Sequence, residues 1–451
     1  MNYFRNSEVH EVADKIYNNL HSTNFVSPIQ NLTDVDFYKF TMGQFIFRFY
    51  PEVEVKFKLI IRDKKISLVE RIVSDEKFKD ELFQSLDYIS SLRFRKTDMF
   101  YLRGMDLYDK NMFKNDYLNF LGNLTLPKLS PKIGFNTFDL GIEGLWSENS
   151  HWETIAMATI TELYYRSMMR DMSEQEVHDM YVISNNRLQN MLLEIKKNPS
   201  ISFSDFGQRR RNSFLWQDYV VKECKRVLGG QFVGTSNTYL AFKHDLVPIG
   251  TNAHELPMVA TALAVGDKAK RNAQYAILKQ WQKVYGKGLR IILPDTFGSE
   301  QFFKNAPDWA SNWIGQRQDS GDPIAEGERY KAWLSGKGIN LLERKTIFSD
   351  GLDISPMKDI TSHFHGNHQA SFGWGTLLTN NFADTVPGNE NFRPFSMVVK
   401  VSEARSNIGS EWNPCVKLSN NIEKATGTPS AIKDYIRIFG DSGRVDQQVV
   451  V

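Results

Sequence analysis

The sequence predicts an α/β protein: an irregular (β/α) barrel with a second α/β domain formed from the N-terminal and C-terminal segments. The first observation is alternation. From about residue 229, short apolar runs end in Gly, Ser, Thr or Asp, and most precede a helical stretch; they lie at 231–237, 246–251, 289–296, 312–321, 345–351 and 369–376. Such alternation is typical of parallel sheet, and six units favour a barrel over an open sheet. The second observation is length, because 451 residues exceed one ordinary domain.

The barrel is expected within residues 151–380, with 1–150 and 381–451 joining to form the other domain. Residues 53–61 alternate apolar and polar, as a strand does, and 396–404 form a second clear strand. Helices are expected at 112–122, 152–169 and 173–197, the last with Ser173 as N-cap and Pro199 beyond its end.

Composition excludes several classes of protein. The chain carries 55 Lys and Arg against 53 Asp and Glu, a net charge of +2, which argues against a nucleic-acid partner. Its two cysteines, Cys224 and Cys415, form no metal spacing and no disulfide framework, so a reducing cytoplasm is expected. Neither a signal peptide nor an apolar run long enough to span a membrane is visible, so no membrane association is expected.

Several of the predicted strands end in residues suited to phosphate or sugar. FGWGT (372–376) and SDG (349–351) offer glycines that let a backbone approach an anion closely. QDSGD (318–322) offers carboxylates that can bind ribose hydroxyls or magnesium. Ordinary strand-to-helix turns favour the same residue types, but their repetition at successive strand ends favours a ligand site.

DFGQRRR (205–211) sets three arginines beside a glycine, an arrangement that could grip pyrophosphate. A solvated charge run is the bland alternative, and no other protein-kinase motif accompanies DFG. GTNAHE (250–255) places a histidine at a strand end, where it could act as a base or nucleophile, although a lone histidine is more often structural. Motifs of serine hydrolases, zinc proteases and P-loop proteins are missing.

Near the N-terminus, DFYKFTMGQFIF (36–47) predicts an amphipathic helix with Met42, Phe45 and Ile46 in the core. A functional alternative turns Tyr38 outward to stack on a flat ligand ring.

Taken together, these motifs form a recognisable set: DxYKxTM (36–42), DFGxRRR (205–211), GTSN (234–237), GTxAHE (250–255), DT (295–296), RxDSGDP (317–323) and FGxGT (372–376). The set resembles the nicotinate phosphoribosyltransferase family. The resemblance implies transfer of phosphoribosyl from phosphoribosyl pyrophosphate to nicotinate, giving nicotinate mononucleotide and pyrophosphate, an entry step of NAD salvage. It also implies ATP hydrolysis through a phosphorylated histidine, a need for Mg²⁺ carried mainly by the substrate pyrophosphate with no metal ligands of the chain, and a homodimer with shared sites.

Residue roles follow from the matching motifs. His254 matches the phosphohistidine and Asp295 the carboxylate that holds its imidazole. Tyr38, reaching from the partner subunit, and Phe206 match two rings that clamp the pyridine. The remaining matches are Arg209 and Arg317 at the pyridine and phosphoribosyl site, Thr251 at nicotinate, Asp319 at ribose, and Asp350, Gly351, Gly375 and Thr376 around the 5′-phosphate.

Ser236 bears on the choice between acid and amide. The related nicotinamide enzymes carry an aspartate at the third position of the GTSN-like segment, whereas a serine hydroxyl can donate to the carboxylate of nicotinate. We therefore predict use of the acid. The alternatives are a nicotinamide phosphoribosyltransferase, a barrel enzyme acting on another phosphorylated sugar, or a binding protein on a decayed enzyme scaffold. Lys400 and Lys417 match pyrophosphate contacts by loose alignment only.

Overall fold

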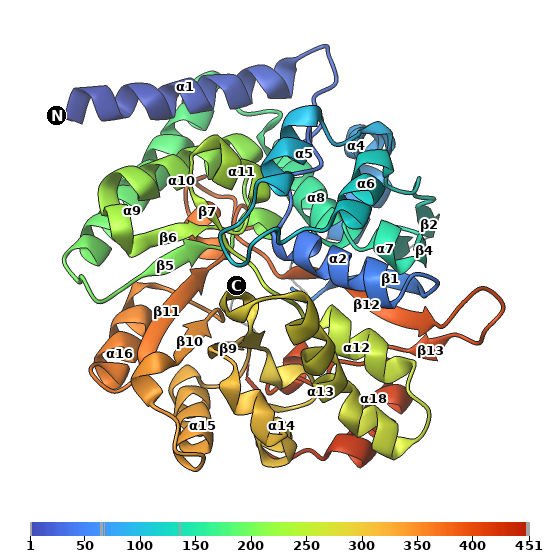
Figure 1. Cartoon of the computed structure of the whole chain (residues 1–451). Helices are drawn as coiled ribbons and strands as arrows, with labels where there is room; N and C mark the ends of the chain where they lie inside the picture. The colour runs from blue at the N-terminus through green and yellow to red at the C-terminus, as the bar shows by residue number, and fades with distance from the viewer. Residues whose placement is uncertain (1, 64–65, 67, 135–136, 448–451) are drawn as a thin grey trace.

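A seven-stranded parallel sheet dominates the structure, a computed structural model that describes residues 2–63, 66, 68–134 and 137–447 (Figure 1). Its strands run in the order β7-β6-β5-β11-β10-β9-β8. Their bounds are β5 Phe203–Asp205, β6 Phe232–Thr235, β7 Val247–Pro248, β8 Ile291–Ile292, β9 Gly315–Gln318, β10 Lys345–Phe348 and β11 Gln369–Trp374. Every pair in this sheet is parallel, so all seven carboxyl ends meet along one edge.

The sheet is curled, and its two outer strands approach each other without pairing. In the described part of the chain β7 and β8 share no strand pairing, but Asn252, just after β7, donates a hydrogen bond from Nδ2 to the carbonyl of Ile291 in β8 at 3.1 Å. The predicted irregular barrel is therefore confirmed as an α/β barrel that stays open at one seam.

Helices follow or cover these strands, as Figure 1 shows. They are α8 Trp152–Met169, α9 Glu174–Lys196, α10 Phe214–Leu228, α11 Thr238–Lys243, α12 Glu255–Ala262, α13 Asp267–Val284, α14 Ser299–Asn305, α15 Pro323–Ser335, α16 Ile354–Phe364 and α17 Thr376–Thr379. Short 3₁₀ turns lie at Gln208–Arg210, Gly229–Gln231, Lys287–Leu289, Pro294–Thr296, Asp308–Asn312, Leu341–Glu343 and Ile422–Lys424.

A second sheet joins the two ends of the chain. Its order is β13-β12-β1-β4, with β1 Glu54–Ile61, β4 Ile142–Leu145, β12 Met397–Arg405 and β13 Asn413–Pro414. β1 and β12 are antiparallel, in a register that runs from Glu54 opposite Arg405 to Ile61 opposite Met397. The predicted second domain, built from N-terminal and C-terminal segments, rests on this pairing; its edges at 150 and 380 stay predictions.

The N-terminal segment adds α1 Asn2–His21, α2 Tyr38–Phe49, α3 Leu68–Ser74, α4 Glu76–Ser91, α5 Lys96–Arg103, α6 Asn115–Asn123 and α7 Trp146–Asn149, with a small hairpin of β2 Lys132–Gly134 and β3 Thr137–Asp139. The chain ends in α18 Pro429–Phe439. In Figure 1, α1 lies along the outside of α9 and α10, apart from the other N-terminal helices.

Most predicted elements are confirmed. α8 has the predicted bounds, and Ser173 caps α9 by accepting a hydrogen bond from the backbone N–H of Glu176. The helix predicted at 112–122 begins later, at Asn115. Strand β5 was not predicted, because it has only three residues, ends on the first residue of DFGQRRR and gives no strand periodicity.

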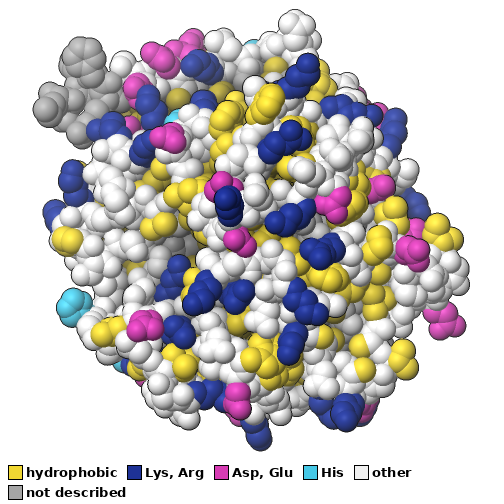
Figure 2. Space-filling view, viewed as in Figure 1, with side chains coloured by type: hydrophobic (Ala, Val, Ile, Leu, Met, Phe, Trp, Pro, Cys, Tyr) yellow, Lys and Arg dark blue, Asp and Glu magenta, His cyan; other side chains and the backbone are white. Residues whose placement is uncertain are grey.

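Each sheet packs against helices through a continuous apolar core that includes Trp146, Trp152, Trp281 and Trp313, each fully buried. On the face drawn in Figure 2, Lys and Arg side chains lie mixed with Asp, Glu and hydrophobic ones. Of the helices in the described ranges, not one combines the length and the apolar character that crossing a membrane would require.

Candidate active site

A cavity opens at the carboxyl ends of the parallel strands, where the sequence predicted the site. Nine of the predicted site residues line it: Phe206, Arg209, His254, Arg317, Asp319, Asp350, Gly351, Gly375 and Thr376. They come from the loops after β5, β7, β10 and β11 and from β9 and the loop that follows it. The strand ends therefore converge as parallel topology requires.

The lining of this cavity is strongly basic. Seven side chains carry positive charge (Arg62, Arg209, Arg210, Arg317, Lys400, Lys417 and Lys424), and two, Asp319 and Asp350, carry negative charge. Asp36, Glu153 and Asp295, just outside the lining, pair with Arg209, Lys400 and Lys417, so the positive charges without an ion pair among the described residues are those of Arg62 and Arg210. These two charges favour an anionic ligand. Arg317 adds a specific signal, because its buried Nε has no hydrogen-bond partner among the described residues.

The three adjacent arginines of DFGQRRR have different surroundings. Arg209 and Arg210 line the cavity, whereas Arg211 is fully buried beneath it. Arg211 pairs with Asp34 in bidentate fashion, Nη1 to Oδ1 at 2.6 Å and Nη2 to Oδ2 at 2.7 Å. Two of the arginines thus face the ligand site, and the third ties the loop to the segment before α2.

Arg210 has little compensation for its charge. Burial, together with the like charges of Arg209 and Arg62, lowers its pKa to about 10, against smaller opposing contributions from Asp319 and Asp350. Burial likewise lowers the pKa of Arg62. Arg210 donates only to neutral groups, the carbonyl of Met397 at 3.3 Å and the hydroxyl of Thr376 at 3.4 Å. An anion bound between these guanidinium groups would relieve their mutual repulsion.

His254 stands just before α12, with both ring nitrogens in contact. Nδ1 lies 2.9 Å from the hydroxyl of Thr296, and Nε2 lies 2.9 Å from Asp319 Oδ2 and 2.9 Å from Lys417 Nζ. The predicted holder of the imidazole, Asp295, is 3.6 Å from Nε2, within ion-pair but not hydrogen-bond range. Thr296, next in sequence, makes the contact to the other nitrogen.

The surroundings of His254 keep its imidazole neutral. Burial lowers its pKa to about 4, and the ammonium of Lys417 adds to the effect, against opposing contributions from Asp295 and Asp319. Nε2 faces a donor, Lys417, and an acceptor, Asp319, at the same distance. In one tautomer Nε2 accepts from Lys417 and Nδ1–H donates to Thr296; in the other Nε2–H donates to Asp319. Burial acts to raise the pKa of the Asp319 carboxyl, but Lys417 and His254 hold that pKa well below its ordinary value. The result is a neutral imidazole, and in the first tautomer its unprotonated nitrogen lies beside an ammonium.

Phe206 lies over the loop that leaves β11. A Cβ on Gly373 would stand 2.3 Å from the ring of Phe206, so only glycine allows the ring to take this position. Gly351, after β10, has φ +57, in the left-handed region that glycine favours. Next to it, the Asp350 carboxylate pairs with the ammonium of Lys424. The predicted phosphate-binding residues therefore line one wall with a cation among them.

Tyr38 is placed within its own chain and does not point outward, in contrast to the functional alternative drawn from the sequence. Its side chain is 6% exposed, and its hydroxyl donates to Glu153 at 3.2 Å. The guanidinium of Arg209 lies 6.0 Å from the centre of its ring. Tyr38 thus supports a side chain of the cavity from the same chain, and a reach into a partner subunit stays a prediction.

Ser236 and Thr251 lie beside the site without lining the cavity. Ser236 donates its hydroxyl proton to Asp36 at 2.5 Å, and Asp36 in turn lies 3.3 Å from Arg209 Nε. The carbonyl of Thr251 accepts a hydrogen bond from the hydroxyl of Thr41 at 2.5 Å. Met42, Phe45 and Ile46 are buried, as the amphipathic pattern of this helix predicted.

Under the cavity lies a buried set of charges that neutralise one another. Lys39 pairs with Glu153 at 2.6 Å and with Glu255 at 2.6 Å, and Glu153 also pairs with Lys400 at 2.7 Å. Glu255 accepts further hydrogen bonds from Trp146 and Ser150. The network therefore connects the residue after His254 to Lys400 on the cavity wall.

Several lining residues were not predicted: Arg62, Gly207, Ser349, Leu352, Leu377, Val398 and Lys424. Gly373, Lys400, Lys417 and Arg210 were named in the sequence analysis without a firm role. Lys424 lies outside the quoted motifs, and Ser349 belongs to the SDG motif, in which only its two neighbours were assigned a role. Arg62 had no usable signal, because it reaches the cavity only through the pairing of β1 with β12.

A basic cavity at the carboxyl edge of a parallel α/β sheet, with a neutral histidine inside it, defines an enzyme class that handles multiply charged, phosphorylated substrates. Comparison with known families is more specific. Residues 201–442 match the nicotinate phosphoribosyltransferase (NAPRTase) family, and residues 33–161 match the N-terminal domain of the same family. The chain belongs to the nicotinate phosphoribosyltransferase family.

Solved structures agree. The nicotinate phosphoribosyltransferase of Vibrio cholerae is 29% identical with a TM-score of 0.81, over 94% of this chain and 95% of that one. The nicotinate phosphoribosyltransferase of Porphyromonas gingivalis is 27% identical with a TM-score of 0.80, over 91% and 100%. A putative nicotinate phosphoribosyltransferase of Saccharomyces cerevisiae shares the fold at 24% identity, with a TM-score of 0.77 over 92% and 99%.

Proposed function

We propose that this protein joins nicotinate to 5-phosphoribosyl 1-pyrophosphate, giving nicotinate mononucleotide and pyrophosphate in NAD salvage, and that it couples this step to ATP hydrolysis. The observation that carries the proposal is the cavity of a member of this family, in which basic side chains surround a neutral histidine. A phosphorylated sugar with a pyrophosphate leaving group fits the excess of positive charge.

The pyridine ring is proposed to lie against Phe206, held in place over Gly373. The nicotinate carboxylate would face Arg209 or Arg317, both of which line the cavity. The structure changes the reason for preferring the acid, because the hydroxyl of Ser236 is already donated to Asp36. Two guanidinium groups, rather than that hydroxyl, now support a preference for a negatively charged pyridine.

The sugar is proposed to lie between Asp319, which would accept hydrogen bonds from its hydroxyls, and the wall formed by Asp350, Gly351, Gly375 and Thr376. Loss of pyrophosphate leaves positive charge on the ribose C1 carbon, and the nicotinate nitrogen supplies the electron pair of the new bond. The chain contributes by placing the nitrogen near C1 and by neutralising the departing pyrophosphate with its arginines and lysines.

Mg²⁺ fits this cavity as a companion of pyrophosphate. His254, Asp295 and Asp319 bring possible ligand atoms within 4.8 Å of one another. Lys417, however, already stands 3.6 Å from Asp295 and 3.5 Å from Asp319, so an ammonium occupies the charge position that a resident ion would take. When bound with the substrate, Mg²⁺ would supply further neutralisation of pyrophosphate, and the partly exposed carboxylate of Asp319 is the group that could contact it.

His254 is proposed to take the γ-phosphate of ATP. Its unprotonated Nε2 would attack phosphorus, the bond to the bridging oxygen of ADP would break, and ADP would leave with that electron pair. Lys417, 2.9 Å from Nε2, is placed to neutralise phosphate oxygens during the transfer. Thr296, holding Nδ1–H, keeps the imidazole in the reactive tautomer.

A homodimer with a shared site is part of the proposal and rests on the resemblance alone, because Tyr38 contacts Glu153 and Arg209 of its own chain and does not line the cavity. Light scattering of the purified protein, together with activity measured across dilution, tests whether activity depends on assembly. Activity that persists in a monomer would show that one chain supplies every residue that the reaction needs.

The decisive experiment is an assay with phosphoribosyl pyrophosphate and nicotinate, nicotinamide or quinolinate, each with and without ATP. We expect product with nicotinate and stimulation by ATP. Product with nicotinamide alone would favour the amide enzyme, and no product with any pyridine would favour a different phosphorylated substrate.

The histidine has a test of its own. Incubation with γ-labelled ATP is expected to leave acid-labile, base-stable phosphate on the protein, and His254→Ala should remove it. His363→Ala serves as control, because His363 is exposed and pairs only with Glu328 among its described ion pairs. Label retained in His254→Ala would disprove the phosphohistidine. Synthesis of the mononucleotide by that variant without ATP would show that the glycosyl transfer itself does not require His254.

A further inference from the structure

A second cluster of metal-ligating side chains lies between α1 and α9, outside the active site. Both helices fall outside the ranges that match the family, 33–161 and 201–442. α1 is held against its neighbours by buried apolar side chains, Val9, Ala13, Ile16 and Leu20. The polar cluster lies along the same contact and is not needed to explain why the helix docks.

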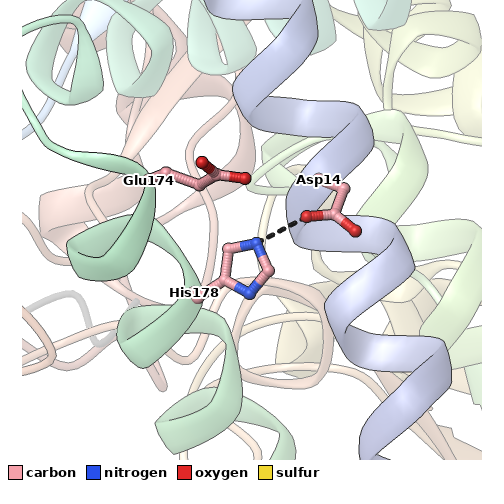
Figure 3. A group of neighbouring side chains, drawn as sticks. All are labelled: Asp14, Glu174 and His178. Atoms are coloured by element: carbon pink, nitrogen blue, oxygen red, sulfur yellow. Dashed lines mark hydrogen bonds and ion pairs between the residues drawn. The ribbon is translucent and has the colours of Figure 1, made fainter.

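Three side chains of this cluster point toward one another (Figure 3). His178 Nε2 lies 2.7 Å from Asp14 Oδ1, and Glu174 precedes His178 by one helical turn on the same face of α9. The ligand atoms of the three residues lie within 4.8 Å of one another. Glu174 is exposed and His178 is half-buried, so the cluster is open to an ion from solvent.

A fourth residue, His10, fixes the orientation of the His178 ring. The two Nδ1 atoms are 2.8 Å apart, and the rings stack with centres 5.1 Å apart and planes 27° apart. One Nδ1 must therefore carry the proton and the other must accept it. Histidine ligands of metal sites commonly show this arrangement, in which the nitrogen away from the ion donates to a fixed partner.

We propose that Asp14, Glu174 and His178 bind a divalent first-row transition-metal ion, with water completing the shell and His10 holding the ring of His178. One imidazole with two carboxylates suits Zn²⁺, Co²⁺ or Mn²⁺, and the imidazole disfavours Mg²⁺. The ion would fasten α1 to α9.

The proton balance of the site is simple. Without metal, His178 Nε2–H donates to Asp14, and His10 Nδ1–H donates to His178 Nδ1. Binding of the ion at Nε2 moves the proton of His178 to Nδ1, which then donates to His10, whose own proton moves to Nε2. For a pair of imidazoles with one proton each, this rearrangement releases no net proton.

Binding is measured on the full-length protein after treatment with chelator, by titration with Co²⁺ followed by visible absorption and with Zn²⁺ followed by calorimetry, in excess Mg²⁺. One ion per chain is expected. His178→Ala should abolish this binding, and His10→Ala should weaken it about 10- to 100-fold while leaving the three ligands in place. His363→Ala is the matched control and should bind as the wild type does.

Glu174→Gln keeps the test decisive if His178→Ala unfolds the helix, because Glu174 is exposed and its replacement leaves the apolar contact untouched. It should weaken Co²⁺ binding at least 10-fold. Zn²⁺ should also slow amide exchange in α1 of the wild type and not of Glu174→Gln. The proposal would be overturned if the wild-type protein did not bind one ion per chain, or if His178→Ala and Glu174→Gln both bound the ion as tightly as the wild type does.

None of these residues lines the active-site cavity, so their substitution should leave synthesis of the mononucleotide unchanged. The proposal therefore stands or fails independently of the proposed function.

Discussion

The wall of the active-site cavity and the layer beneath it use the same residue types in opposite ways. In the wall, Arg62 and Arg210 make no ion pair among the described residues, and the side-chain hydrogen bonds of Arg210 go to a carbonyl and a hydroxyl. Beneath it, Arg211 has both nitrogens on Asp34, and Lys39 lies between Glu153 and Glu255. The unpaired guanidinium groups of Arg62 and Arg210 indicate where an anion binds, whereas the ion pairs beneath the wall hold the loops in place.

The largest expected effect breaks the paired layer. Arg211→Met should lower the free energy of unfolding by about 3–5 kcal/mol, because it leaves the carboxylate of Asp34 buried without its partner. Chemical denaturation measures the loss. A loss below about 1 kcal/mol would show that this pair does not fix the loop.

A second effect, up to about 3 kcal/mol, concerns His254 and acid pH. Its pKa in the folded state is about 4, below the ordinary value of 6.5, so between these values the unfolded chain binds a proton that the folded chain does not. Stability should therefore fall as pH drops from about 6.5 to 4 and be unaffected by this group above 6.5. His254→Gln should lose less stability over that window, and His363→Gln should follow the wild type. Denaturation curves at several pH values decide the matter.

Arg210→Met should impair substrate binding and leave stability nearly unchanged, whereas Arg211→Met should mainly lower stability. Stability should change by less than about 1 kcal/mol, since the arginine is surrounded by like charge and makes only neutral contacts. The KM for phosphoribosyl pyrophosphate should rise about 10- to 100-fold, corresponding to about 1.5–3 kcal/mol for a hydrogen bond to a charged group. Steady-state kinetics with urea denaturation of the same sample makes the comparison direct. Equal destabilisation by the two arginine variants would refute the distinction between wall and layer.

The smallest expected effect is at Gly373. Gly373→Ala would place a methyl 2.3 Å from the Phe206 ring and should displace it, lowering kcat/KM for nicotinate by about 10-fold, or about 1.4 kcal/mol. Gly122→Ala, where nothing lies within 4 Å of the added carbon, is the control. Unchanged nicotinate kinetics in Gly373→Ala would mean that the ring of Phe206 does not hold the pyridine.

The sequence predicted the parallel strands, the position of the cavity and most of its lining, because glycine turns and polar side chains recur where such strands end. It could not separate Arg210 from Arg211, since adjacent residues of one type give no local signal of which is buried. Arg62 lay beyond prediction for another reason. Its place depends on the pairing of β1 with β12, and no local pattern specifies a partner so distant along the chain. The hydrogen bond from the Ser236 hydroxyl to Asp36 was not predicted, because this acceptor comes from another segment of the chain.

The antiparallel contact of β1 with β12 also bears on how the protein is made. Glu54 leaves the ribosome early, whereas Arg405 emerges only when synthesis is nearly finished. The edge of β1 that pairs with β12 therefore stays unpaired while the parallel sheet forms, although β4 is available early for its other edge. Arg62 and Lys400 come together only when β1 and β12 pair, because Arg62 directly follows β1 and Lys400 lies on β12. A nascent polypeptide should consequently gain its fold before it gains affinity for anions, and chaperone contacts are expected to concentrate on residues 54–61 during translation.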